Sequence, residues 1–451
     1  MNDTIVAIST ALGVGAISIV RASGKEAIEI VNSVFSGKDL TKVDSHTIHY
    51  GYIIDNEEKI DEVLVSVMRA PKTFTCEDVV EINCHGGIAT TNKVLELLLT
   101  KGCRIAEPGE FTKRAFLNGR IDLMEAESVM DLINSKTEFS RKLAISSLNG
   151  NGSKLISKLR EDLVGIISNI EVNIDYPEYN DIYEVTENDL RSKIDTFKST
   201  LQRIIKEYEN GKILKDGINV VIVGRPNVGK SSILNKLLDS EKAIVTDIPG
   251  TTRDIVEGSI TLNGIPLNII DTAGIRETED VVEKIGVNKS LEKIDEADLV
   301  LVILNNNESL DDTDLSILER IKDRPSIVVI NKDDLSSKID MSLLDGYNVV
   351  LTNTLEFQGI DSLKDKIIEM FNLDKISQND YNYISNARQI AKIKECLEII
   401  KEIETSLNNG VPLDMLETDL KRVWNILGEI IGESYSEELL DELFSKFCVG
   451  K

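Results

Sequence analysis

One short segment of this sequence has the residue types and the spacing that bind phosphate. Residues 224–231, GRPNVGKS, fit the pattern G-x-x-x-x-G-K-[ST] between an apolar run and a segment with helical periodicity. The glycines let backbone N–H groups curl around a phosphate, and the start of the following helix favours negative charge. We therefore predict that Lys230 neutralises the β- and γ-phosphates of a nucleotide and that Ser231 binds Mg²⁺.

A second motif selects the base. Residues 331–334, NKDD, fit the guanine signature N-K-x-D and follow an apolar run. The Asp334 carboxylate can accept two hydrogen bonds, from the ring N–H and from the amino group of guanine. Adenine has no such pair of donors, and each buried acceptor left unpaired costs about 1–3 kcal/mol. The motif therefore predicts that the nucleotide is GTP and not ATP.

Two more segments supply the metal site and the switches. Residues 271–274, DTAG, follow another apolar run, and we expect Asp271 to hold the metal ion through water and Gly274 to sense the γ-phosphate. Thr252, in the segment 249–254 (PGTTRD), offers a second hydroxyl group to Mg²⁺. Four such motifs in this order predict a Ras-like P-loop GTPase.

The glutamine that many small GTPases place directly after D-x-x-G is missing. Ile275 stands there, so hydrolysis needs another water-orienting group and another positive charge on the transition state. Asn227 can bind a monovalent cation beside the β–γ bridge, with oxygens of residues 246–251 completing the cage, but it suits a simple turn equally well. Arg253 and Arg276 are candidate charge donors, although exposed switch arginines are more often only solvated.

These motifs lie in a segment, residues 215–372, that alternates short apolar runs with amphipathic helices. Alternation of this kind predicts a mostly parallel sheet covered by helices. The expected strands are residues 218–223, 267–270, 299–304, 327–330 and 349–351, and the expected helices begin near Lys230, Val282, Leu310 and Ile360.

Helical periodicity dominates on both sides of that segment, in residues 119–214 and 373–451. Apolar residues recur there at steps of three and four, which indicates long helices with one buried stripe, and Pro177 ends the first of them. The stripes lie in residues 155–170, 390–407 and 413–430. We therefore predict one discontinuous helical domain that is interrupted by an inserted G domain.

The first 118 residues mix strand and helix signals. Strands are expected over residues 46–54, 62–68 and 79–83, and a helix over 91–99. These signals predict an α+β domain, 1–118, with no strong catalytic motif of its own. Together the three parts predict a multidomain chain of the α/β and α classes.

Composition excludes several classes of protein. The chain has 451 residues, of which 41% are hydrophobic and 28% charged, so disorder is not its dominant state. No run approaches the ~18 apolar residues of a membrane span, and the N-terminus lacks the pattern of a signal peptide. Five scattered cysteines indicate reduced thiols, so we expect a cytoplasmic protein. A net charge of −26 repels polyanions, so contact with RNA needs a local basic patch or a partner's surface.

Longer stretches of the sequence resemble a known family from end to end. The segments NDTIVAIST, PGEFTKRAFLNG, GRPNVGKSS, TDIPGTTRD, DTAGIRE and FCVGK are similar to those of the MnmE (TrmE) family of bacterial tRNA-modification GTPases. The resemblance implies a homodimer that works with the flavoprotein MnmG in a heterotetramer, with FAD bound by the partner only. It also implies that a carboxymethylaminomethyl or aminomethyl group is added to C5 of the tRNA wobble uridine. The one-carbon donor would be 5-formyl- or 5,10-methylene-tetrahydrofolate, and glycine or ammonium would supply the nitrogen.

The resemblance also implies roles for residues of the G domain. Glu283 takes the water-orienting role of the missing glutamine, and the catalytic set is Glu283, Asn227 and Gly250. The implied metal ligands are Asn227, Thr246, Ile248 and Thr251 for K⁺, and Ser231 and Thr252 for Mg²⁺. The implied nucleotide-binding residues are Asn227, Val228, Gly229, Lys230, Ser231, Ser232, Thr246, Asp247, Ile248, Pro249, Gly250, Thr251, Thr252, Asp271, Thr272, Ala273, Gly274, Asn331, Lys332 and Asp334.

In the N-terminal domain the resemblance implies folate binding and the dimer contact. The folate contacts fall on Arg21, Glu81, Arg120 and Lys451. The family commonly has Lys at the position of Arg120, so the charge is kept but the donor geometry changes. From the residues alone, a solvated carboxylate at a strand edge is the favoured interpretation of Glu81. A further departure is residues 352–354, TNT, where GTPases often carry Ser-Ala-Lys beneath the base, so guanine affinity is expected to be modest.

One alternative function belongs to a different class. A non-catalytic switch GTPase would only dock partners during ribosome assembly. Such GTPases often append an RNA-binding KH module with a Gly-x-x-Gly loop. The C-terminal glycines form no such loop, which disfavours this alternative; they are Gly410, Gly428, Gly432 and Gly450.

Overall fold

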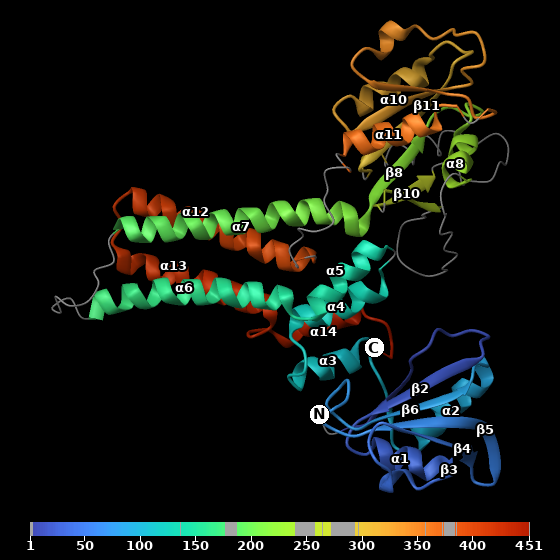
Figure 1. Cartoon of the computed structure of the whole chain (residues 1–451), viewed down its shortest axis with the longest axis vertical. Helices are drawn as coiled ribbons and strands as arrows, with labels where there is room; N and C mark the ends of the chain where they lie inside the picture. The colour runs from blue at the N-terminus through green and yellow to red at the C-terminus, as the bar shows by residue number, and fades with distance from the viewer. Residues whose placement is uncertain are drawn as a thin grey trace. The chain divides into compact units, whose positions relative to one another are not determined.

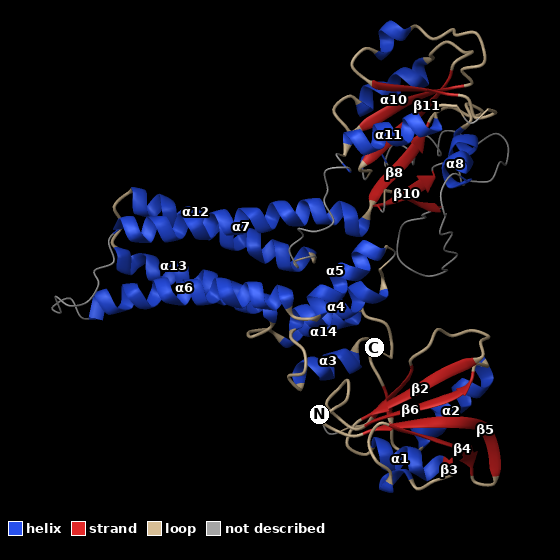
Figure 2. Ribbon diagram, viewed as in Figure 1, coloured by secondary structure: helices blue, strands red, loops and turns tan. Residues whose placement is uncertain are grey.

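The computed structural model divides the chain into two compact units, each built from separate stretches of sequence. It describes residues 3–135, 137–175, 187–239, 258–263, 265–271, 294–295, 297–356, 358–371, 373, 384 and 386–450. The first unit comprises Met1–Ile133, Ala144–Leu201 and Asn386–Lys451, and the second comprises Asn134–Leu143 and Gln202–Ser385. The first unit thus holds the expected N-terminal domain and most of both helical blocks (Figure 1 and Figure 2). The residue boundaries of the three domains stay a prediction.

The N-terminal part of the first unit is a seven-stranded sheet in the order β3-β4-β5-β6-β2-β1-β7. Neighbouring strands are antiparallel except for β1 and β7. Helices α1 (Ala27–Val34) and α2 (Ile88–Thr100) pack on one face, over the buried alternate residues of the strands (Figure 2). The strands are β1 (Ile5–Ile8), β2 (Ile17–Ser23), β3 (Phe35–Ser36), β4 (Thr47–Asp55), β5 (Glu58–Met68), β6 (Val79–His85) and β7 (Arg104–Ile105). The predicted α+β character is confirmed.

Long helices make up the rest of the first unit. Helix α6 is described as far as Asp175, and Pro177, which is expected to end it, lies outside the described residues. Its apolar stripe is buried against α13, which also packs on α12. The helices are α3 (Glu110–Leu117), α4 (Leu123–Ile133), α5 (Glu138–Leu148), α6 (Asn151–Asp175), α7 (Glu187–Asp216), α12 (Ala387–Asn408), α13 (Leu413–Ile431) and α14 (Glu437–Ser445), of which α5 and α7 are shared between the units. None of the described helices has the length and apolar character that a membrane span requires.

A buried ion pair joins helices from the two helical blocks. Glu127 on α4 is 5% exposed and accepts hydrogen bonds from Arg388 Nε at 2.7 Å and from Gln389 Nε2 at 2.6 Å, both on α12. Arg388 also donates to the backbone carbonyl groups of Glu429 and Ile430, at the C-terminal end of α13. The Glu127 carboxylate therefore binds a side chain that is 261 residues away in the sequence, which links the two helical blocks.

The C-terminal residues pack against the first strands of the chain. The Ser9 hydroxyl donates to the carbonyl oxygen of Gly450 at 3.2 Å, and the Gly109 N–H donates to that of Cys448 at 3.2 Å. Gly450 has φ 87°, and a Cβ atom there would lie 2.6 Å from the carbonyl oxygen of Ile8. This close approach requires glycine, so the N-terminal sheet and the C-terminal tail form one packed structure.

The second unit contains a six-stranded sheet in the order β13-β12-β11-β8-β10-β9. All pairs are parallel except β9 with β10. The elements are β8 (Ile218–Val223), α8 (Lys230–Asp239), β9 (Gly258–Leu262), β10 (Ile265–Asp271), β11 (Leu299–Asn305), α10 (Asp312–Ile321), β12 (Ser326–Asn331), β13 (Asn348–Thr352) and α11 (Ile360–Met370). The five predicted strands are present, and β9 is an edge strand that we did not predict. The helix expected near Val282 lies outside the described residues.

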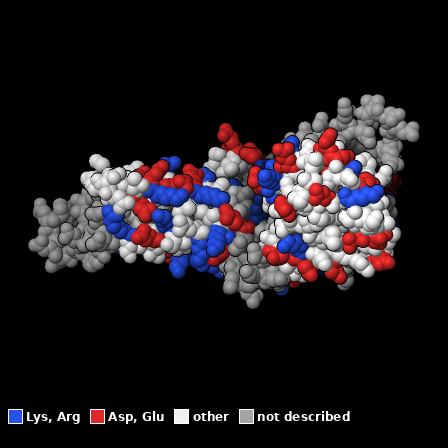
Figure 3. Space-filling view, turned by 90° about the horizontal axis from the view of Figure 1, so that it is seen from above, with Lys and Arg blue, Asp and Glu red and all other residues white. Residues whose placement is uncertain are grey.

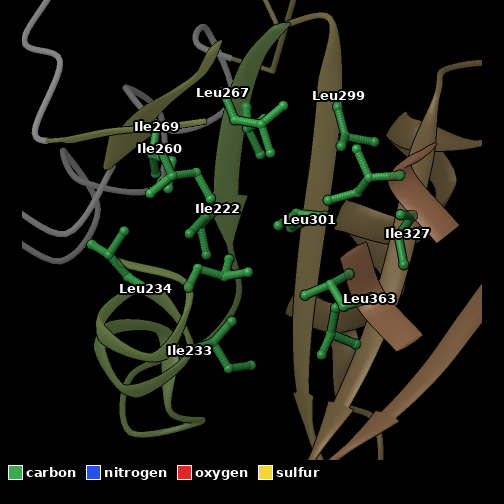
Figure 4. Close-up of a cluster of buried hydrophobic side chains, with 14 of the residues drawn as sticks. Ile222, Ile233, Leu234, Ile260, Leu267, Ile269, Leu299, Leu301, Ile327 and Leu363 are labelled. Carbon is green, nitrogen blue, oxygen red and sulfur yellow. The ribbon is translucent and has the colours of Figure 1, made fainter. Parts of the chain in front are cut away.

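Helices cover both faces of this sheet. Side chains of α8 and α11 pack with alternate strand residues on one face, including Leu301 of the central strand β11 (Figure 4). Helix α10 packs on the opposite face. In a parallel sheet the carboxyl ends of the strands meet at one edge, where ligands bind. The carboxyl ends of β8, β10 and β12 therefore meet there, and the nucleotide motifs adjoin these ends in the sequence.

Candidate nucleotide-binding site

The phosphate loop connects the end of β8 to the start of α8. Gly224 has φ 147°, and a Cβ atom there would lie 2.3 Å from the carbonyl oxygen of Ile303, so a side chain is excluded. Lys230 is the first residue of α8, and its Nζ donates to the carbonyl oxygens of Gly224 and Arg225, each at 2.8 Å. The ammonium group is thus held at the loop, where it can meet a phosphate.

The first residue of the base motif is tied to the phosphate loop. Asn331 ends β12 and is 1% exposed, and its Nδ2 donates to the carbonyl oxygen of Val228 at 3.0 Å. A Cβ atom on Gly229 would lie 2.2 Å from the same Nδ2 atom, so this loop position requires glycine. The hydroxyl of Thr352, at the end of β13, donates to Asn331 Oδ1 at 3.4 Å. Thr352 therefore orients Asn331. The sequence did not predict this role, because it marks residues 352–354 only as different from the usual Ser-Ala-Lys.

The second residue of the base motif makes another link to the loop. Lys332 has a left-handed backbone, with φ 65°, and its Nζ donates to the carbonyl oxygen of Asn227 at 3.2 Å. Asp334 is exposed two residues further on, beyond a turn in which the Asp333 N–H donates to the Thr352 carbonyl oxygen. The structure thus brings the predicted phosphate and base motifs together through two side chains.

Asn227 has a left-handed backbone conformation, with φ 62°. Asparagine is one of the few residues that adopt this region at low cost. This geometry supports the turn-forming interpretation of Asn227, while its role as a cation ligand stays a prediction. Ser231 and Ser232 are exposed in the first turn of α8, and Val228 is buried beneath the loop.

Several predicted site residues lie outside the part of the chain that the structure describes. The backbone of Asp271 ends β10 at the same edge of the sheet as the phosphate loop, but its side chain is not among those described. The remaining residues outside the described ranges are Thr246, Asp247, Ile248, Pro249, Gly250, Thr251, Thr252, Thr272, Ala273, Gly274, Glu283 and Lys451.

In the first unit, two of the predicted folate residues are in contact. Arg21 and Glu81 are paired across β2 and β6, and the Arg21 Nε and Nη2 atoms each lie 2.8 Å from Glu81 Oε1. Arg21 Nη1 also donates to the Gly450 carbonyl oxygen at 3.1 Å, so this pair adjoins the C-terminal tail. Arg120 makes separate contacts: its Nη1 donates to the Phe74 carbonyl oxygen, and its guanidinium lies 4.8 Å from the centre of the Phe74 ring.

Family models match nearly the whole chain. The model described as the GTP-binding protein TrmE N-terminus matches residues 4–120, and the MnmE helical domain model matches residues 123–448. The protein named tRNA modification GTPase MnmE of Bacillus thuringiensis (strain Al Hakam) is 53% identical over 455 residues, covering 100% of this chain and 99% of the relative. The chain belongs to the MnmE (TrmE) family. The protein of the same name from Bacillus anthracis is also 53% identical over 455 residues, with the same coverage.

Membership of the MnmE family confirms the predicted multidomain fold and identifies the chain as a GTP hydrolase of the tRNA-modification class. Two solved GTPase structures also align with part of the chain. The G domain of the T. maritima FeoB iron transporter is 32% identical, with a TM-score of 0.26, over 34% of this chain and 98% of that one. A variant of Aquifex aeolicus Era bound to GDP.AlF4- is 28% identical, with a TM-score of 0.27, over 40% of this chain and 66% of that one.

Proposed function

We propose that this MnmE-family chain is a K⁺-activated GTPase that acts with the FAD-dependent partner MnmG on tRNA. Together they would add a carboxymethylaminomethyl or aminomethyl group to C5 of the wobble uridine, with a tetrahydrofolate derivative as one-carbon donor. The observation that carries the nucleotide part is the link from Asn331 and Lys332 to the phosphate loop. The segments that would read guanine and bind phosphate are thereby hydrogen-bonded to each other at one edge of the sheet.

The GTP site needs Mg²⁺ and a second cation. Ser231, exposed in the first turn of α8, can offer its hydroxyl to Mg²⁺, with Thr252 as the second hydroxyl ligand. A K⁺ ion bound by Asn227 and by oxygens of residues 246–251 would supply the positive charge beside the β–γ bridge. This charge is what other GTPases obtain from an arginine. Glu283 would orient the attacking water.

GTP turnover is expected to be at least about tenfold faster in KCl than in NaCl at equal ionic strength. One fixed positive charge beside the transition state can raise the rate by that factor or more. Asn227→Ala should remove this preference. Asn263, which also has a left-handed backbone (φ 51°) but lies in the β9–β10 turn, provides the control for backbone strain. Asn263→Ala should keep the K⁺ preference, and equal rates of the wild-type protein in the two salts would refute the cation mechanism.

Folate binding is supported by the geometry around Arg21. Guanidinium groups recognise carboxylates through paired hydrogen bonds, and tetrahydrofolate carries carboxylates on its glutamate tail. Arg21 and Glu81 offer a cation and an acceptor side by side, next to the segment that leads to Lys451. Arg120 is exposed and stacks on Phe74. These residues would hold 5-formyl- or 5,10-methylene-tetrahydrofolate.

A homodimer is supported by the open face of the N-terminal sheet. Helices α1 and α2 cover one face, and on the other face Phe111 of α3 packs with Ile5 and Ala7 of β1. Elsewhere on that second face the described strands display apolar side chains at Ile17 (63% exposed), Ile48 (65%), Tyr50 (58%) and Leu64 (47%). Tyr50 and Leu64 are opposite each other in the β4–β5 register. An exposed apolar patch on neighbouring strands marks an interaction surface, and a second copy of the chain would cover it.

The charge of the chain supports the proposal that a partner protein binds most of the tRNA. The net charge is −26, and on the face drawn in Figure 3 basic and acidic side chains are interspersed over the described surface. No broad basic patch covers the described part of that face, so the tRNA would gain little attraction there. MnmG would therefore present most of the RNA-binding surface and the FAD. All five cysteines are free thiols, which fits a cytoplasmic location.

The decisive experiment compares tRNA from cells with and without this gene. Nucleoside analysis is expected to show that the modified wobble uridine disappears on deletion and returns with the wild-type copy. Levels of the modified nucleoside that stay the same in both strains would overturn the proposal and favour the ribosome-assembly switch instead.

A further inference from the structure

Arg225, the second residue of the phosphate loop, is held by a group of carboxylates at the start of α10. Its Nη1 atom lies 3.0 Å from Asp311 Oδ2, its Nη2 atom lies 3.2 Å from Glu308 Oε2, and its Nε atom lies 3.0 Å from Asp314 Oδ2. The side chain is 19% exposed. The other loop residue with a long cationic side chain, Lys230, binds within the loop, whereas Arg225 fastens the loop to a neighbouring helix.

Asp314 is an unusual partner because it is fully buried. Its side chain is 0% exposed, and burial away from water raises the pKa of its carboxyl group. One of its oxygens accepts from the Asp311 N–H in the capping box of α10, while Oδ1 has no hydrogen-bond partner within the described chain. A buried carboxylate needs a nearby cation, so the Arg225 side chain is strongly constrained to stay there.

Holding the Arg225 side chain in place also restrains the loop atoms that position Lys230. The Arg225 backbone carbonyl is one of the two that accept from Lys230 Nζ, at 2.8 Å. The backbone of Gly224, just before it, packs closely on Ile303, since a Cβ atom there would lie 2.3 Å from the Ile303 carbonyl oxygen. Fixing the side chain of Arg225 therefore fixes the carbonyl groups against which the Lys230 ammonium rests.

We propose that Arg225 is a positioning residue for nucleotide binding, which pre-organises the phosphate loop through its ion pairs with Asp311 and Asp314. Its side chain acts through the loop backbone and not through a contact with the nucleotide. This inference adds a residue to the nucleotide site and rests on the proposed function. A loop that is already ordered loses less conformational freedom when a ligand binds, so affinity rises without any new contact. Loss of Arg225 should therefore weaken the binding of GDP and GTP while chemistry at saturation is retained.

The test uses the full-length chain and the fluorescent probe N-methylanthraniloyl-GDP. Arg225→Gln leaves Asp314 as a buried charge without its cation, so this variant should also lose thermal stability. The double variant Arg225→Gln/Asp314→Asn removes that charge and should regain most of the melting temperature. Its affinity for the probe is expected to stay about tenfold below that of the wild type, because the loop has no anchor. KM for GTP should rise in parallel, with kcat within about twofold of the wild-type value.

A matched control is Arg320→Gln: Arg320 lies on α10, as Asp314 does, and likewise pairs with an aspartate, Asp295, but its side chain is 41% exposed. It should leave affinity unchanged. If the double variant regains wild-type affinity together with its stability, Arg225 is only a counter-ion for Asp314 and the inference is wrong. Failure of the wild-type protein to bind the probe would instead refute the proposed nucleotide site.

Discussion

Asp334→Asn is expected to change the nucleotide preference from GTP to XTP. The kcat/KM for GTP should fall by about 10³-fold or more, because the amide cannot accept the second hydrogen bond from the guanine amino group. Xanthine carries a carbonyl oxygen at that position, to which the asparagine amide can donate, so XTP turnover should rise. Asp334 is exposed beyond the turn that follows β12, where a base can reach it. Steady-state kinetics with both nucleotides measures the change.

The neighbouring carboxylate provides the control for that substitution. Asp333 is also exposed, but its Oδ1 atom contacts Asn306 Nδ2 at 3.4 Å and its role is confined to the turn. Asp333→Asn should leave kcat/KM for GTP within about twofold of the wild-type value. An Asp334→Asn variant that still prefers GTP would show that the base is read by other groups, and the specificity argument would fail.

Glu127→Ala is expected to destabilise the helical part of the first unit by about 3–5 kcal/mol, because it leaves the partly buried Arg388 guanidinium without its anion. The Gln389 amide would also lose its acceptor. Urea unfolding followed by fluorescence reports on this part alone, since the single tryptophan is Trp424 on α13. Trp424 stacks on Arg160, whose guanidinium lies 4.1 Å from the ring centre, so its emission should change when the helices separate.

A surface pair gives the comparison for this stability measurement. Lys401 and Glu398 lie on the same helix as Arg388 at 2.7 Å from each other, but their side chains are 46% and 66% exposed. Glu398→Ala should shift the transition by less than about 1 kcal/mol. Equal shifts for the two variants would contradict the view that the buried pair holds the helical blocks together.

Local patterns in the sequence were enough to predict the parts of the site that lie close together in the chain. The strand–loop–helix around residues 218–239 combines an apolar run, two glycines with special backbone angles and a helix start, all within one short stretch. The buried stripes of α12 and α13 follow from helical periodicity in the same way. Alternation of strands and helices was likewise enough to predict the parallel sheet.

Contacts between distant segments were not predictable from such patterns. Thr352 can donate a hydrogen bond to Asn331 only because β13 lies beside β12. Arg225 can pair with Asp314 only because α10 lies near the phosphate loop. Two-residue periodicity shows which face Glu81 occupies, but not that Arg21 lies opposite it, because periodicity carries no information on register. The family resemblance names both residues as folate contacts, but their pairing is a finding of the structure. Strand β9 was missed because it is short and Ile260 and Leu262 are its two buried hydrophobic side chains among the described residues, which gives a weak signal.

The docking of Gly450 onto Ser9 has a consequence for the order of events during synthesis. The two residues are 441 positions apart, so at about 5–20 residues per second the ribosome needs roughly 20–90 s to make the second after the first. Throughout that interval the earliest strands are present without the tail that completes them. The site beside Arg21 therefore cannot be completed until Gly450 has been synthesised and has left the ribosome.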